Sequence, residues 1–234
     1  MNGPLAKRLA AEALGTSFLL MAVVGSGIMA ARLSGGNAAL ALLANTLATG
    51  ATLAVLIAIF GPLCGAHFNP AVTLHFVLRG EIDRRSALAY ALCQSLGALA
   101  GVAVAHAMFA APLLEISAAP RDGPPQWLSE FVATFGLLAT IAGAARHRPS
   151  AVPALVGLYI AAAYWFTAST SFANPAATMA RAFTNSFSGI APASVPGFVA
   201  AQLLAVLAAQ PVLGWLFAPD GGSAAAQKGI INPS

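Results

Sequence analysis

Six long apolar stretches constrain this chain more than any other feature of its sequence. A helix needs about 20 apolar residues to cross the hydrocarbon core of a bilayer, and each stretch has about that length. They are Leu9–Ala31, Ala38–Phe60, Ser86–Phe109, Trp127–Ala145, Ala151–Phe172 and Val195–Phe217. The sequence therefore predicts an all-α integral membrane protein with six transmembrane helices.

The composition excludes a soluble domain. Charged residues make up 8% of the 234 residues, whereas soluble domains carry about 25%. The bases lie in the gaps between the apolar stretches and form no patch with interleaved aromatic residues, so we expect no nucleic-acid partner. Cys64 and Cys93 match no metal-ligand spacing, and we expect neither a metal site nor a cofactor.

The positions of the bases indicate how the chain is oriented. An even number of spans puts both termini on one side, and that side then carries eight bases against three on the other. The eight are Lys7, Arg8, Arg79, Arg84, Arg85, Arg146, Arg148 and Lys228, and the three are Arg32, Arg121 and Arg181. Lys and Arg are in excess on cytoplasmic loops. The sequence therefore predicts a multi-pass protein of the inner (plasma) membrane with both termini in the cytoplasm.

The two halves of the chain repeat one another. Glu12 in the first span corresponds to Glu130 in the fourth, and an Asn-Pro-Ala motif follows both the second and the fifth span. Each half has three spans, an odd number, so the second copy is inserted upside down, and such repeats hold a substrate path at their interface. We expect a first repeat over 1–112, a connecting loop over 113–126, a second repeat over 127–219 and a flexible cytoplasmic tail over 220–234.

The two motifs, Asn69-Pro70-Ala71 and Asn174-Pro175-Ala176, predict re-entrant half-helices. Asn caps helix starts and Pro is favoured at the first helical position, so we expect short helices over about 70–78 and about 175–184. Inversion brings the two helix starts face to face at mid-membrane. Each start carries about half a positive charge, and together they form a barrier to cations, including protons. A structural bundle that uses both motifs only as helix caps is the alternative.

The chain resembles the aquaporin and aquaglyceroporin family, the major intrinsic proteins, over essentially its whole length. The segment Gly65-Ala66-His67-Phe68-Asn69-Pro70-Ala71-Val72-Thr73 is close to that family's first signature, and the doubled Asn-Pro-Ala is highly specific. The resemblance implies six spans with two half-helices, a pore within each protomer and a homotetramer.

Two carboxylates inside spans, Glu12 and Glu130, have two interpretations, because a charge at that depth is costly. One hypothesis is a proton relay in a secondary transporter. The other is loop support, in which each carboxylate accepts hydrogen bonds from the backbone of an Asn-Pro-Ala loop. Their symmetric placement, one in each half, favours loop support, and the family resemblance implies the same role.

The positions that form the family's outer selectivity filter depart from its pattern. In water-selective members the resemblance leads us to expect an aromatic residue, a His, a small residue and an Arg. Counted by offset from the two motif asparagines, the positions here are Thr49, Ala162, Ser171 and Ala177. All four side chains are small, which predicts a constriction wider than a single water and argues against a strictly water-selective pore.

Two larger residues nearby have open roles. Phe172 is able to swing into the space that the small residues leave. Arg181 lies four residues beyond Ala177, on the same face of the predicted half-helix. It is either a vestibule cation that favours polar or anionic solutes, or an interfacial arginine that faces lipid headgroups or a neighbouring protomer.

The surroundings of the second motif, residues 172–190, resemble a bacterial branch of aquaglyceroporins associated with arsenic detoxification. We expect a passive channel for small neutral solutes such as glycerol, water and metalloid hydroxides including arsenite, with methylated arsenicals as further candidates. The alternatives are a proton-coupled secondary transporter that uses Glu12 and Glu130, and a non-conducting scaffold. We expect no enzyme, because nothing in the sequence resembles a nucleophile–base pair or a metal site.

Overall fold

The computed structural model describes residues 4–218, and its regular structure there is helical. Six segments are long and apolar enough to cross a membrane, as predicted. Their α-helices are α1 (Leu5–Leu33), α2 (Ala38–Cys64), α4 (Arg84–Met108), α5 (Pro124–His147), α6 (Val152–Phe166) and α8 (Val195–Leu216). Single 3-10 turns, Pro149–Ala151 and Pro192–Ser194, lead into α6 and α8. The predicted tail over 220–234, with Lys228, lies outside the described residues.

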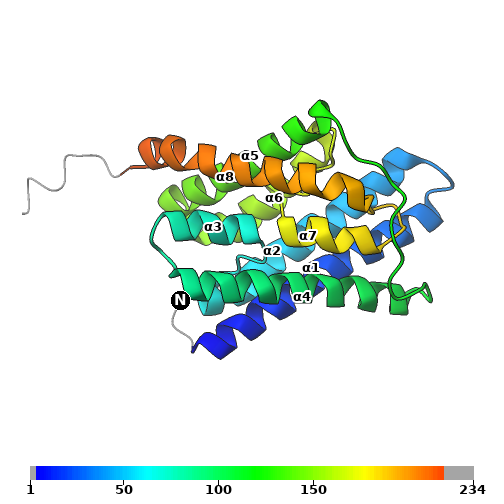
Figure 1. The fold of residues 1–234 in the computed structure, drawn as a ribbon, viewed down its shortest axis with the longest axis horizontal. Coiled ribbons are helices and arrows are strands. Elements are labelled where there is room, and N and C mark those ends of the chain that lie inside the picture. The colour runs from blue at the N-terminus through cyan, green and yellow to red at the C-terminus, as the bar shows by residue number, and fades with distance from the viewer. Residues whose placement is uncertain (1–3, 219–234) are drawn as a thin grey trace, which may run out of the picture.

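Two short helices follow the Asn-Pro-Ala motifs and lie end to end inside the bundle (Figure 1). The first, α3 (Pro70–Leu78), has the predicted bounds. The second, α7 (Pro175–Ala180), is shorter than predicted and continues only as a 3-10 turn over Arg181–Phe183. Each has a proline at its start, directly after an Asn whose side chain caps the helix.

The fifth span ends six residues earlier than the apolar run suggested, at Phe166 instead of Phe172. Ser171 and Ala173 have φ of 50° and 47°, a left-handed conformation that an α-helix of L-residues does not contain. The hydroxyl of Thr167 donates to the carbonyl of Ala163 at 2.6 Å, and hydroxyls that bond nearby backbone compete with helix propagation. The prediction was wrong here because hydropathy alone cannot separate the end of a span from an apolar loop.

Glycines let the spans approach closely. α1 packs along α4, and α2 packs along α6. A Cβ at Gly97 of α4 would collide with the carbonyl oxygen of Ala13 in α1, and Gly50 and Gly157 face one another in the same way across α2 and α6. Close backbone contact drives helix association in a bilayer, where lipid is as apolar as the side chains.

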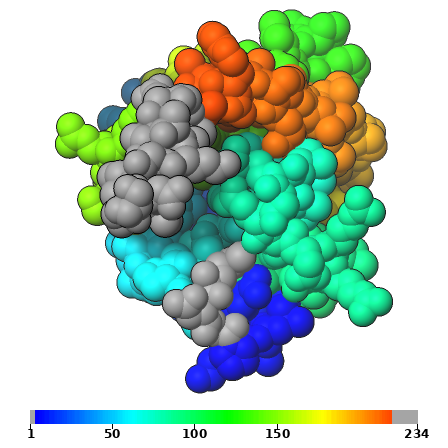
Figure 2. Space-filling model, turned by 90° about the vertical axis from the view of Figure 1, so that its left-hand side faces the viewer, coloured from blue at the N-terminus to red at the C-terminus, as the bar shows by residue number. Residues whose placement is uncertain are grey.

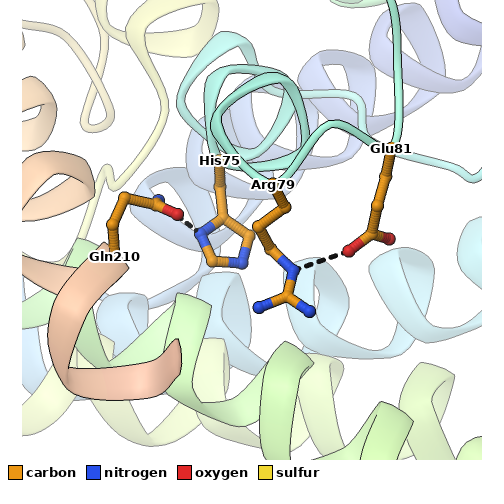
Figure 3. Close-up of polar contacts among 4 residues, drawn as sticks. All are labelled: His75, Arg79, Glu81 and Gln210. Atoms are coloured by element: carbon orange, nitrogen blue, oxygen red, sulfur yellow. Dashed lines mark hydrogen bonds and ion pairs between the residues drawn. The ribbon is translucent and has the colours of Figure 1, made fainter. Parts of the chain in front are cut away.

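Both ends of the described chain lie at one end of the bundle, as six spans require (Figure 1). The start of α1, the turn after α3 and the end of α8 gather on this face (Figure 2). Arg79 and Glu81 form an ion pair of 2.6 Å in that turn. One turn earlier, the His75 Nδ1 of α3 lies 2.8 Å from the Gln210 amide of α8 (Figure 3), so that the C-terminal end of the half-helix is fastened to the sixth span.

Candidate functional site

A cavity of about 190 Å³ lies between the two repeats and reaches both Asn-Pro-Ala loops. Most of the side chains that line it are apolar. Its polar lining residues are Thr49, His67, Asn69, Tyr164, Ser171, Asn174 and Arg181. An apolar channel with a few convergent polar groups is typical of a site for small molecules.

Both motif asparagines line this cavity, and each is hydrogen-bonded to the opposite repeat. The Asn69 amide donates to the carbonyl of Ala173 at 2.7 Å, and the Asn174 amide donates to the carbonyl of Phe68 at 2.8 Å. Their side-chain oxygens accept from the first turns of their own helices, so that Asn69 receives the amide of Ala71 at 2.8 Å. An amide nitrogen carries two protons, and among the described residues one acceptor is found for each asparagine amide.

Glu12 and Glu130 make the contacts that loop support requires. Glu12 accepts from the backbone amides of His67 and Phe68 at 2.9 and 2.7 Å. Glu130 accepts from Phe172 and Ala173 at 2.8 Å each. A glutamine completes each set, Gln94 beside Glu12 and Gln202 beside Glu130. Both carboxylates are fully buried, and all four of their oxygens accept hydrogen bonds.

The loops that these carboxylates hold have an uncommon backbone. Ala66 and Phe68 before the first motif, and Ser171 and Ala173 before the second, have φ between 47° and 50°. Non-glycine residues with positive φ cost about 1–3 kcal/mol each and persist only where the surroundings fix them. The amides bonded by the buried carboxylates lie in these same segments, so the carboxylates are what fixes them.

Three of the four predicted filter residues, Thr49, Ser171 and Ala177, line the cavity, and the fourth does not. Ala162 is exposed on the outer face of α6. The residues of α6 that line the cavity are spaced by four, the repeat of one helix face, and they are Val152, Val156, Ile160 and Tyr164. Counting by offset from Asn174 selected Ala162, which lies two residues before Tyr164 and therefore on the opposite face of α6.

Arg181 lines the same cavity and is 3% exposed. Its guanidinium carbon lies 3.3 Å from the centre of the Phe172 ring, and its Nε donates to the carbonyl of Ser188. Such burial excludes the interfacial interpretation, in which Arg181 faces headgroups or another protomer. Phe172 is 5% exposed and also lines the cavity, so its ring is held in place.

A second arginine near this ring was missed by the sequence analysis. Arg121, from the segment between the repeats, has its guanidinium carbon 5.2 Å from the Phe172 ring centre. Its Nε donates to the carbonyl of Gly189 at 2.8 Å, and its backbone amide to the Ser194 hydroxyl at 3.0 Å. Arg121 therefore fastens the connecting segment onto the loop that holds Arg181. The sequence signal was weak: a lone base in the longest polar connection.

Comparisons with known proteins agree with this arrangement. A family model described as "Major intrinsic protein" matches residues 2–173. The chain is 60% identical over 215 residues to aquaglyceroporin AqpS of Rhizobium meliloti (strain 1021), with 92% of each chain covered. It is 34% identical to aquaporin NIP1-3 of Oryza sativa subsp. japonica, over 67% of this chain and 54% of that one. A solved aquaglyceroporin from Plasmodium falciparum has the same fold, with a TM-score of 0.68 at 20% identity over 91% of this chain and 100% of that chain.

Proposed function

Because this chain belongs to the major intrinsic protein family, whose members are channels and not enzymes, we propose that it is a passive pore for small neutral solutes. It is a multi-pass membrane protein of aquaglyceroporin type. The proposed solutes are glycerol, water and metalloid hydroxides such as arsenite, with methylated arsenicals as further candidates. The observation that carries the proposal is one cavity lined by both asparagines and by the small residues Thr49, Ser171 and Ala177.

The proposed path passes Thr49, Ser171 and Ala177 and then runs between Asn69 and Asn174. The starts of α3 and α7 both point at this crossing, and their dipoles oppose any cation there. At the crossing, a neutral solute gives up hydrogen bonds to water and accepts hydrogen bonds from the amide groups of the two asparagines instead. Proton conduction through a continuous water file is penalised at the same point.

In this proposal Arg181 supplies the fixed positive charge that an arginine at position 177 would supply in a water-selective relative. It lines the cavity from one helical turn further along. The smaller Ala177 leaves room beside it, so the outer constriction is charged and is wider at that position than an arginine there would leave it. Polar solutes are favoured in the vestibule, and small cations are not.

The transporter alternative is disfavoured by the bonding of its proposed proton carriers. A carboxylate that shuttles protons has to release its partners in each cycle. Every oxygen of Glu12 and Glu130 accepts a hydrogen bond, and the backbone amides among the donors belong to strained loops. A transporter predicts glycerol accumulation driven by a pH gradient, and the channel predicts equilibration only.

We further propose an inner-membrane location, with both termini in the cytoplasm, and a homotetramer with one pore in each protomer. The location is supported by the bacterial source of the 60% identical relative and by the side on which the bases gather. The tetramer is supported by family membership alone. Cross-linking in native membranes tests it, and a species of four subunits is the expected product.

The deciding experiment is stopped-flow light scattering on proteoliposomes with water and glycerol. Wild type passes both, and Ala177→Arg loses glycerol but keeps water, because the added side chain fills the wide part of the constriction. Ala162→Leu is the matched control, since Ala162 is exposed on the outer face of α6, and it leaves both fluxes unchanged. Wild-type vesicles that exclude glycerol contradict the proposal.

A further inference from the structure

A second, open pocket of about 370 Å³ lies at the end of the bundle opposite the termini. The ends of α1 and α4, the start of the segment between the repeats and the segment after α7 form its walls (Figure 1). None of the described residues lines both this pocket and the cavity of the two motifs. Its charged lining residues are Arg32 at the end of α1 and Glu115 between the repeats, and both are exposed.

The depth of this pocket in the bilayer follows from the exposed face of α4. Every fourth residue of α4 from Leu88 to Met108 is exposed, which is the spacing of one helix face. From Leu88 to Met108 the helix advances by 20 residues, or about 30 Å, which is the thickness of the hydrocarbon core. The pocket opens just beyond Met108 and therefore lies at the level of the lipid headgroups.

The segment that carries Glu115 continues the apolar face of α4. Leu113, Leu114 and Ile116 surround this glutamate in the chain, and each is more than half exposed. Clusters of exposed large apolar side chains mark surfaces that contact a membrane or a partner. Because these residues follow directly on the end of α4, we assign their contact to lipid. Acyl chains along α4 thus have their headgroup ends beside the pocket.

The inner wall of the pocket is already satisfied by the protein. His106 is 2% exposed, and its Nδ1 lies 2.6 Å from the carbonyl oxygen of Pro112. Its Nε2 lies 2.7 Å from the hydroxyl of Thr184. Both ring nitrogens therefore have partners, and a ligand in the pocket depends on other groups.

Arg32 and Glu115 keep most of their hydrogen-bonding capacity. The Arg32 Nη2 donates to the carbonyl of Phe109 at 3.0 Å, and a guanidinium carries five N–H donors. Glu115 accepts a long hydrogen bond of 3.4 Å from the Asn185 amide. Although they line one pocket, Arg32 and Glu115 form no ion pair with each other within residues 4–218. A cation and an anion thus remain available on the same pocket wall.

We propose that this pocket binds the headgroup of a phosphatidylethanolamine-type lipid, with the phosphate at Arg32 and the primary ammonium at Glu115. Arginine binds phosphate through paired N–H donors. A primary ammonium offers three N–H donors to a carboxylate, and the quaternary ammonium of choline offers none. The acyl chains lie along the exposed face of α4. The site is separate from the solute path, so the inference does not depend on which solute the pore passes.

The test is native mass spectrometry of the detergent-solubilised protein, with dioleoyl phosphatidylethanolamine and dioleoyl phosphatidylcholine titrated in parallel. The two lipids share chains and phosphate and differ in the ammonium group. Wild type binds the ethanolamine lipid with an apparent Kd about 5-fold lower, the upper end for an exposed charge pair. Glu115→Gln abolishes this preference. Arg32→Gln weakens the binding of both lipids alike, because both carry the phosphate.

Asp122→Asn is the matched control, because Asp122 is an exposed acid of the same segment that does not line the pocket, and this variant keeps the preference. Glycerophosphoethanolamine, the headgroup without chains, does not displace the lipid at equal concentration, because the chains contribute to binding. Displacement would assign the pocket to a free phosphate ester and overturn the inference. Equal Kd values for the two lipids in wild type, or a Glu115→Gln variant that retains the preference, overturn it as well.

Discussion

At the scale of single residues, five buried side chains, three of them charged and two of them amides, shape the cavity, and they act on different parts of it. Glu12 and Glu130 hold the two Asn-Pro-Ala loops in place. Asn69 and Asn174 join the two repeats, because each donates to a backbone carbonyl of the opposite repeat. Arg181 then places a positive charge in the wall of the cavity. Their roles are separable, so single substitutions have distinct outcomes.

Glu130→Gln is expected to destabilise the protein. In the wild type, backbone amides donate to the Glu130 carboxylate, and the substitution replaces one of its acceptor oxygens with a donating NH2 group. Each buried donor that loses its acceptor costs about 1–3 kcal/mol. The apparent Tm in detergent falls, and Glu12→Gln behaves alike because its contacts are equivalent. Glu115→Gln is the control, since Glu115 is exposed. An unchanged Tm for both buried variants would contradict loop support.

Arg181→Ala is expected to admit small cations. Removing one charge at about 4 Å from a passing ion changes its energy by about 1 kcal/mol even in water, which corresponds to a cation flux about 5-fold higher or more. Decay of a potassium diffusion potential in proteoliposomes measures this flux. Arg32→Ala is the control, because Arg32 packs on Phe109 away from the cavity. If the potential decays at the wild-type rate in Arg181→Ala vesicles, Arg181 does not contribute to the cation barrier, which then lies at the asparagines alone.

At the scale of elements, the sequence predicted the six spans and α3 well because both depend on local patterns. Span length follows hydropathy, and the start of α3 follows from Asn69 and Pro70. The end of α6 and the length of α7 depend on tertiary contacts instead. The apolar run past Phe166 was taken for helix, and the offset count from Asn174 separately placed Ala162 in the filter. Tyr164 and Arg121 escaped notice because only the folded chain brings them to the cavity and to Phe172.

Gly97→Ala is expected to separate α1 from α4. An added Cβ would meet the backbone carbonyl of Ala13, which cannot move aside as a side chain can. We expect a lower Tm and a loss of glycerol flux, because the displaced α1 carries Glu12 away from its loop. Gly214→Ala is the matched control in α8: nothing lies within 4 Å of its Cβ position, so the variant is neutral or more stable by up to about 1 kcal/mol. Equal Tm values for the two variants would show that the close contact between α1 and α4 at Gly97 does not determine the stability of the protein.

At the scale of the whole molecule, two inverted repeats meet at one cavity and gather most of the bases at one end. Repetition was readable from the sequence because Glu12 and Glu130, and the two motifs, recur in order. The contacts between the two repeats could not be predicted from the sequence. The bonds of Asn69 and Asn174 to opposite carbonyls depend on inversion and on the depth to which α3 and α7 enter the bundle.

Orientation is testable by labelling cells with a membrane-impermeant maleimide, in a Cys93→Ser background. Leu114→Cys lies in the segment between the repeats and is expected to react from outside. Arg148→Cys lies between α5 and α6 and is expected to react only after permeabilisation, because cytoplasmic turns hold the excess of bases. Both positions are exposed. The reverse labelling pattern would invert the proposed topology.

The crossed asparagine bonds also set an order on biosynthesis. Asn69 and its acceptor Ala173 are 104 residues apart, and Asn174 and Phe68 are 106 apart. When the ribosome has delivered only the first repeat, the Asn69 amide and the Phe68 carbonyl have no partner at mid-membrane, where polar groups left unpaired are costly. We therefore expect the centre of the protein to be completed only when the second half-helix provides the Ala173 carbonyl and the Asn174 amide.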